Sequence, residues 1–105
     1  MPLEQLTHEE KKIVFACLCA IAKGPFIHTG EMRYRGGGER QELYKLIEKW
    51  PDIDDSDGRV WRMLNGSMNV MSHGVLVVSP EECEAWCGVD RDAVKKVFEK
   101  WKGED

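Results

Sequence analysis

The chain has 105 residues, a length typical of a single domain, and 42% of its residues are hydrophobic while 32% are charged. This composition excludes an intrinsically disordered chain and predicts one globular domain over residues 1–105. Fifteen basic and nineteen acidic residues give a net charge of −4, which argues against a protein that binds nucleic acid through a generally basic surface.

The first predicted helix begins after Thr7 and ends at the Gly24-Pro25 pair. Thr7 and Glu10 have the spacing of a capping box, and a glycine followed by a proline is typical of a helix end. From residue 13 onward nearly every position is apolar, so we expect this helix to be central and buried. The apolar run 13–22 is too short to cross a bilayer, and we expect no membrane association.

Residues 25–38 are predicted to be irregular. Two apolar residues there, Met32 and Tyr34, alternate with arginines, which allows a short extended piece, and the glycines at 36–38 predict a flexible hinge. A second helix is expected over residues 39–50 because four apolar side chains recur at helical spacing: Leu43, Leu46, Ile47 and Trp50. Pro51 ends that helix.

An acidic loop over residues 52–58 precedes the third predicted helix. Ser56 or Asp57 is expected to cap this helix, which runs to about Ser72 and turns its apolar residues inward. Gly66 lies in the middle of the helix, where glycine is unfavourable, and predicts a kink or a close helix crossing. The third helix is expected to lie in the centre of the molecule beside the first.

The apolar segment 75–78 is predicted to be a buried connector, since no second strand is evident to pair with it. The sequence Ser79-Pro80-Glu81-Glu82 is a second capping box and opens a short helix over residues 80–87. Gly88 closes that helix, and Asp90 caps a last helix with an apolar stripe. The sequence therefore predicts an all-α, compact bundle of about five helices.

An internal repeat divides the predicted bundle into two halves, about 7–50 and 57–102. A shift of 51 residues aligns the sequence of residues 37–50 with that of residues 88–101, and six of the fourteen positions are identical. Glycine, arginine and the final tryptophan recur in addition to the apolar stripe. The repeat predicts that two similar helical halves pack about a pseudo-two-fold axis, with their long helices central.

No group of residues predicts a catalytic or metal site. The cysteines lie at 17, 19, 83 and 87 within predicted helices and lack zinc-ligand spacing, so we expect free core thiols. The acidic loop fails the EF-hand pattern, and the glycine run lacks the ending of a P-loop. We expect no enzyme, no cofactor and no metal, and a cytoplasmic location because the N-terminal sequence lacks a secretory signal layout.

Residues 80–99 resemble the helix-turn-helix motif of DNA-binding proteins. The resemblance rests on Gly88 in the turn, Val94 six residues later, and apolar residues where the motif makes its internal contacts: Cys83, Cys87, Val89 and Val97. It implies a second, recognition helix whose basic side chains meet DNA: Arg91, Lys95, Lys96 and Lys100. Residues 80–105 carry eight acids and five bases, whereas DNA-reading surfaces are positive, so we keep this function as the alternative.

The preferred hypothesis is a small, non-enzymatic module for protein–protein interaction. Two segments are candidate contacts with an unknown protein partner: the residues before the glycine run, Arg33, Tyr34 and Arg35, and the aspartates of the acidic loop, Asp52, Asp54, Asp55 and Asp57. The acidic segment would suit a basic partner. Tryptophan is enriched at interface hot spots, so any of the four tryptophans that stays exposed would add to such a surface.

Overall fold

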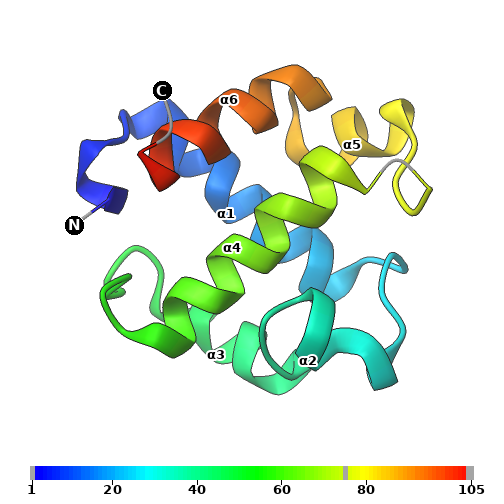
Figure 1. The fold of residues 1–105 in the computed structure, drawn as a ribbon, viewed down its shortest axis with the longest axis horizontal. Helices are drawn as coiled ribbons and strands as arrows, with labels where there is room; N and C mark the ends of the chain where they lie inside the picture. Colours follow the sequence, from blue (N-terminus) through cyan, green and yellow to red (C-terminus); the bar gives the residue numbers. More distant parts are fainter. Residues whose placement is uncertain (1, 75, 104–105) are drawn as a thin grey trace.

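The computed structural model describes residues 2–74 and 76–103, and within these ranges the regular elements are all helical. Six α-helices and two 3-10 turns follow one another along the chain (Figure 1): η1 (Pro2–Gln5), α1 (His8–Lys23), η2 (Thr29–Glu31), α2 (Met32–Arg35), α3 (Arg40–Lys49), α4 (Gly58–His73), α5 (Pro80–Cys87) and α6 (Arg91–Lys102). The predicted all-α class is confirmed. No helix in the described ranges is long and apolar enough to cross a membrane.

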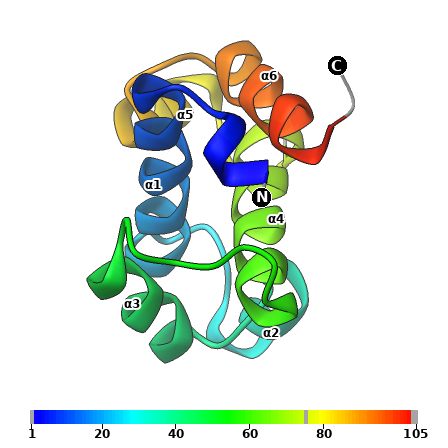
Figure 2. The same cartoon turned by 90° about the vertical axis from the view of Figure 1, so that its left-hand side faces the viewer.

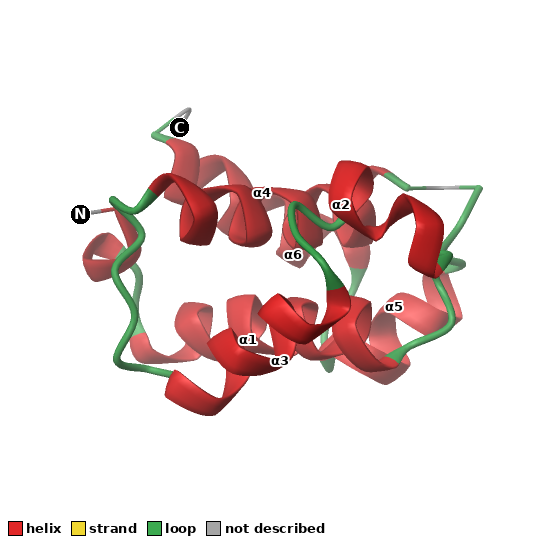
Figure 3. Cartoon of the chain, turned by 90° about the horizontal axis from the view of Figure 1, so that it is seen from below, coloured by secondary structure: helices red, strands yellow, loops and turns green. Residues whose placement is uncertain are grey.

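The helices form two layers whose central members are α1 and α4. Helices α3 and α5 pack beside α1, α2 and α6 pack beside α4, and the two long helices contact each other (Figures 2 and 3). The prediction that these two helices are central is therefore confirmed. Helix α6 also contacts η1, so the described chain ends lie at the same end of the molecule (Figure 1).

Local hydrogen bonds fix the helix starts where the sequence predicted them. The Thr7 hydroxyl accepts from the backbone N–H of Glu10 at 3.1 Å, while the Glu10 carboxylate accepts from the Thr7 N–H at 2.8 Å. Ser79 forms the second predicted capping box, and Asp90 caps α6. Of the two candidates for α4, Asp57 is the cap, since its carboxylate accepts from the N–H of Arg59.

Two expectations for the first connector are wrong. Residues 32–35 form the helical turn α2 instead of an extended piece, because a turn buries Met32 fully and leaves its neighbours exposed. The glycine run is not a flexible hinge, because Gly36 and Gly38 are buried and Gly37 packs on the backbone of α4. The prediction of a buried connector at 75–78 is confirmed only in part: Val78 is buried, whereas the Leu76 side chain is exposed to solvent, and Val75 lies outside the described residues.

The buried apolar residues form one cluster between the layers, and Trp101 is its largest fully buried side chain. Its indole N–H donates to the Asp55 carboxylate at 3.1 Å, and the backbone N–H of Leu3 donates to the same oxygen at 2.8 Å. Because Asp55 is buried, this shared oxygen ties the loop between α3 and α4 to both ends of the described chain.

Two arginines anchor the two connectors to the helices that follow them. Arg40, the first residue of α3, donates to the backbone oxygens of Ala22 and Ile27. Arg91, the first residue of α6, donates to the backbone oxygen of Val78. A guanidinium satisfies carbonyls that no helix or sheet pairs, which keeps each connector close to the core.

Candidate functional site

A groove of about 430 Å³ lies between α2, α4 and the start of the second connector. The residues that matter for its chemistry come from all three segments: Tyr34, Arg35, Asn65, Asn69, His73 and Leu76. We call this feature the α2–α4 groove. Figure 1 shows the segments that contribute these residues: α2, the diagonal helix α4 and the loop that follows α4.

The α2–α4 groove carries the two most exposed large apolar side chains of the described residues. Leu76 is 98% exposed and Tyr34 is 85% exposed, whereas Tyr44, Trp61 and Trp86 are each 38% exposed. A single exposed apolar residue is ordinary on a protein surface. Two such residues on one groove are typical of an interaction site.

Asn65, Asn69 and His73 form a polar row along one face of α4. Each follows the previous residue by four positions, so the row rises about 6 Å per step. Within the described part of the chain, neither asparagine amide hydrogen-bonds to another residue. Each amide therefore offers one acceptor oxygen and one donor nitrogen to a ligand.

A close crossing at Gly66 sets the geometry of the groove. A Cβ atom at this position would lie 2.5 Å from the backbone oxygen of Arg35 and 2.8 Å from the backbone carbon of Gly36. The predicted close crossing at Gly66 is thus confirmed, and its partner is the end of α2. Only glycine lets this segment lie directly against α4, which brings Tyr34 and Arg35 to the asparagine row.

The charge of the groove differs from that of the chain. Its lining contains Arg35 and His73 and no carboxylate, although the chain carries a net charge of −4. Arg35 pairs with Glu31 over 3.5 Å with both side chains more than half exposed, a contact too weak to hold the guanidinium. Three other surface grooves each include at least one carboxylate: Glu42, Glu39 and Asp52 respectively.

The first predicted contact segment lies at this groove. Arg33, Tyr34 and Arg35 are all exposed on α2, and the last two line the groove. Arg33 instead forms an ion pair with Glu39 at 2.5 Å. The structure therefore brings Tyr34 and Arg35 together with residues of α4 that sequence analysis did not nominate.

The second predicted contact segment is largely used by the fold. Asp55 is 1% exposed and is bound to Leu3 and Trp101, so it is unavailable to a partner and we remove it from the candidate contacts. Asp57 caps α4. Hydrogen bonds from Ser56 hold Asp54 and lower the pKa of its carboxyl group.

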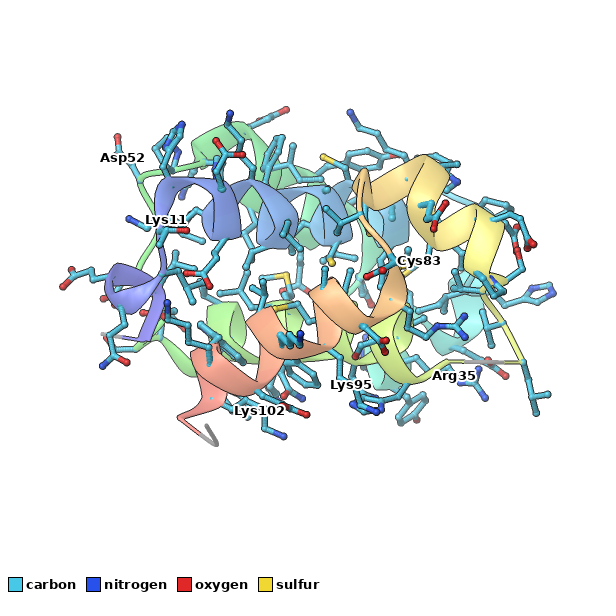
Figure 4. All side chains as sticks on the ribbon, turned by 90° about the horizontal axis from the view of Figure 1, so that it is seen from above. Lys11, Arg35, Asp52, Cys83, Lys95 and Lys102 are labelled. Carbon is cyan, nitrogen blue, oxygen red and sulfur yellow. The ribbon has the colours of Figure 1, made fainter. Side chains whose placement is uncertain are left out.

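Asp52 is exposed, and its carboxylate makes no hydrogen bond or ion pair within the described residues. Figure 4 shows Asp52 and Arg35 toward opposite ends of the molecule. The two predicted contact segments therefore do not form one continuous site.

Two of the four predicted DNA contacts are held by the protein itself. Arg91 donates to Val78, and Lys100 forms an ion pair with Glu10 at 2.8 Å. Lys95 and Lys96 are exposed on α6, where Figure 4 marks Lys95. The helix before them, α5, exposes three acids: Glu81, Glu82 and Glu84.

The cysteines are free thiols, as predicted, and three of them are buried together. The sulfur atoms of Cys17 and Cys87 lie 3.9 Å apart. Burial raises the pKa of Cys83 to about 11, and the contact with Cys87 together with burial raises that of Cys17. The described residues contain no group of three or more histidine, cysteine or acidic side chains able to hold a metal ion.

Sequence reasoning missed the exposure of Leu76 and the position of the asparagine row in a groove. The spacing of Asn65 and Asn69 was visible, but their exposure on one groove depends on α2 lying beside them. The apolar run at 75–78 resembled core, and only the turn after α4 places Leu76 outside it.

Comparisons with known proteins give no further assignment. No protein-family model, no curated protein and no solved structure matches the chain. The α2–α4 groove is consequently the basis for a functional conclusion.

Proposed function

We propose that this protein is a non-enzymatic interaction module that binds a polypeptide partner in the α2–α4 groove. The observation that carries the proposal is that one groove contains both the two most exposed apolar side chains, Tyr34 and Leu76, and two side-chain amides without a hydrogen bond in the fold. These amides belong to Asn65 and Asn69. Apolar anchors surrounded by polar groups are typical of protein interaction surfaces.

Two further observations support this class of function. The buried thiols of Cys17 and Cys83, whose pKa values are raised, are poor nucleophiles at neutral pH, and Cys87, whose pKa the contact with Cys17 lowers, is buried beside them. Four free cysteines also agree with the expected cytoplasmic location, where thiols stay reduced.

The test compares three forms of the immobilised protein in a nuclease-treated lysate of the source organism. The groove variant combines Tyr34→Ala with Leu76→Ser, and the matched control is Tyr44→Ala on α3. Proteins retained by the wild type and the control but lost from the groove variant are then purified and titrated directly. We expect at least a tenfold weaker Kd for the groove variant.

Two results contradict the proposal. Either the wild type retains no protein that binds it directly, or the groove variant binds the retained proteins as tightly as the wild type. Circular dichroism of all three forms checks that the substitutions leave the fold intact, since both altered groove side chains are exposed.

DNA binding by residues 80–99 is the second candidate function. Its support is the exposure of Lys95 and Lys96 on the second helix after a tight turn at Gly88. Fluorescence anisotropy of a labelled random-sequence duplex at about 50 mM and about 200 mM salt tests it. Micromolar binding that weakens steeply with salt and is lost in Lys95→Glu/Lys96→Glu supports this function, and no binding at low salt contradicts it.

A further inference from the structure

We propose that the α2–α4 groove binds its partner as an extended segment, held along the backbone by Asn65 and Asn69, and that it selects acidic side chains. This inference rests on the proposed function and specifies the conformation and charge of the partner. It follows from the spacing of the asparagine row, the polar side chains that α4 contributes to the groove and the absence of carboxylates in its described lining.

The spacing of the row matches an extended chain. Residues four apart on a helix are about 6 Å apart along its axis. Alternate residues of an extended chain are about 6.6 Å apart. In an extended chain, the N–H and C=O of one residue point to the same side, and those of the residue two positions later repeat this direction.

Each asparagine amide is suited to one such residue. Its nitrogen donates to a backbone oxygen, and its oxygen accepts from the N–H of the same residue. The side-chain amides of Asn65 and Asn69 make no hydrogen bond within the described protein, so binding exchanges only water for the ligand. From Asn65 to His73 the row covers about 12 Å, the length of about four extended residues.

The composition of the groove lining disfavours a helical partner. A helix satisfies its own backbone hydrogen bonds and docks by an apolar stripe in an apolar groove. Here α4 contributes Asn65, Gly66 and Asn69 to the lining beside the smaller apolar Val70, and the large exposed apolar side chains come from the flanking segments, Tyr34 from α2 and Leu76 from the loop after α4. Those two side chains are placed to contact the alternating side chains of an extended segment.

The charge of the groove selects the side chains of the partner. Arg35 and His73 line it, the described lining includes no carboxylate, and the Glu31 carboxylate that pairs with Arg35 lies outside that lining. The weak exposed pair with Glu31 leaves the Arg35 guanidinium free to bind a carboxylate of the ligand in a bidentate manner.

The experiment selects random twelve-residue peptides, displayed on phage, against the full-length protein. We expect an excess of Asp and Glu over Lys and Arg in the enriched peptides. One enriched peptide is then synthesised with an N-methyl group at each backbone nitrogen in turn. The expected pattern is loss of binding at alternate positions over about four residues, because alternate N–H groups face the asparagines.

Matched variants connect this pattern to the named residues. Asn65→Ala and Asn69→Ala should each weaken the Kd at least tenfold, whereas Gln41→Ala, which removes an exposed amide from α3, should not change it. Arg35→Glu should remove the preference for acidic peptides. Thermal unfolding of the three alanine variants should match the wild type, because none of these side-chain amides is hydrogen-bonded within the described fold.

The outcomes separate this inference from the proposed function. If peptides depend on Tyr34 and Leu76 but tolerate N-methylation everywhere or bind as helices, the extended mode is wrong and the function stands. If enriched peptides show no acidic excess and ignore Arg35→Glu, the charge selection is wrong. If no peptide is enriched, or the Tyr34→Ala/Leu76→Ser variant binds the enriched peptides unchanged, both proposals fail.

Discussion

The halves predicted by the repeat, residues 7–50 and 57–102, share several local structures. Gly37 and Gly88, which correspond under the shift of 51, have φ angles of +81° and +76°. Arg40 and Arg91, which also correspond, each donate to a backbone oxygen thirteen residues earlier. These shared features support the repeat, which we keep as a proposal.

The halves differ in how they bury these shared structures. Gly37 is pressed against the backbone of Arg62, whereas nothing lies within 4 Å of a Cβ atom built on Gly88. Trp101 is 1% exposed, whereas the corresponding Trp50 is only partly buried and packs on Phe15 at a ring distance of 5.3 Å.

The comparison shows that two segments with the same local hydrogen bonds and backbone angles can differ in which side chains they leave exposed to a partner. The connector of the first half packs on α4 and forms one wall of the α2–α4 groove, while that of the second half supplies Leu76. Tertiary packing therefore determines which polar and apolar groups remain available to a partner.

The largest predicted difference concerns the paired tryptophans. Trp101→Ala should lower the free energy of unfolding by about 4 kcal/mol, because it empties a fully buried site, whereas Trp50→Ala should lose about 2 kcal/mol. Urea denaturation followed by circular dichroism measures both. If the alanine variant does not fold, Trp101→Phe replaces it, because this variant keeps a ring and lacks only the indole N–H and part of the buried volume. Equal losses at the two positions contradict the comparison.

The segment joining the halves gives the next largest effect. Asp55→Ala should lower the free energy of unfolding by about 3 kcal/mol, because it leaves the Leu3 N–H and the Trp101 indole N–H without their acceptor. Asp52→Ala, an exposed control in the same loop, should change it by less than about 0.5 kcal/mol. A similar loss in both variants would show that the shared oxygen has no special role.

Whether a structural feature could be predicted from the sequence depends on how far apart along the chain the interacting residues lie. The caps Thr7, Asp57, Ser79 and Asp90 were all predicted, because each bonds to a backbone group within three residues. The burial of Asp55 was missed, because its partners lie 52 and 46 residues away in sequence.

The candidate site follows the same rule. Tyr34 and Arg35 were nominated from the sequence because they adjoin the glycine run, and Gly66 was expected to allow a close crossing. That the crossing brings α2 to the asparagine row depends on tertiary packing, which no local pattern contains.

Gly37 and Gly88, the corresponding glycines with left-handed backbone angles, test the comparison within one residue type. Gly88→Ala should lose about 1 kcal/mol, the usual cost of a left-handed alanine. Gly37→Ala carries the same cost and also forces a Cβ atom to 2.0 Å from the Arg62 backbone oxygen, so it should lose about 2 kcal/mol more. Urea denaturation again measures the difference, and equal losses would mean that the first connector is not tightly packed on α4.

The smallest effect concerns the ion pair that links the first helix of one half to the last helix of the other. The Lys100 ammonium 2.8 Å away, aided by the Thr7 N–H, holds the pKa of Glu10 below its ordinary value of 4.5. A carboxyl group with a lowered pKa in the folded state stabilises the protein above pH 4.5 and loses this contribution as the pH falls through the lowered pKa.

Glu10→Gln keeps an oxygen for the Thr7 N–H but removes the charge, so it isolates the ion pair. We expect the variant to be less stable than the wild type by less than about 1 kcal/mol at pH 7, and the difference to vanish on acidification. Glu9→Gln is the matched control, because Glu9 lies in the same helical turn but pairs only with Lys12 at 3.4 Å, fully on the surface. Urea denaturation between pH 3 and pH 7 measures the free energy of unfolding of the wild type and both variants. If the Glu10→Gln difference persists at low pH, or if Glu9→Gln has an equal effect, the stabilisation belongs to the α1 terminus alone. The Glu10–Lys100 pair would then not stabilise the contact between α1 and α6.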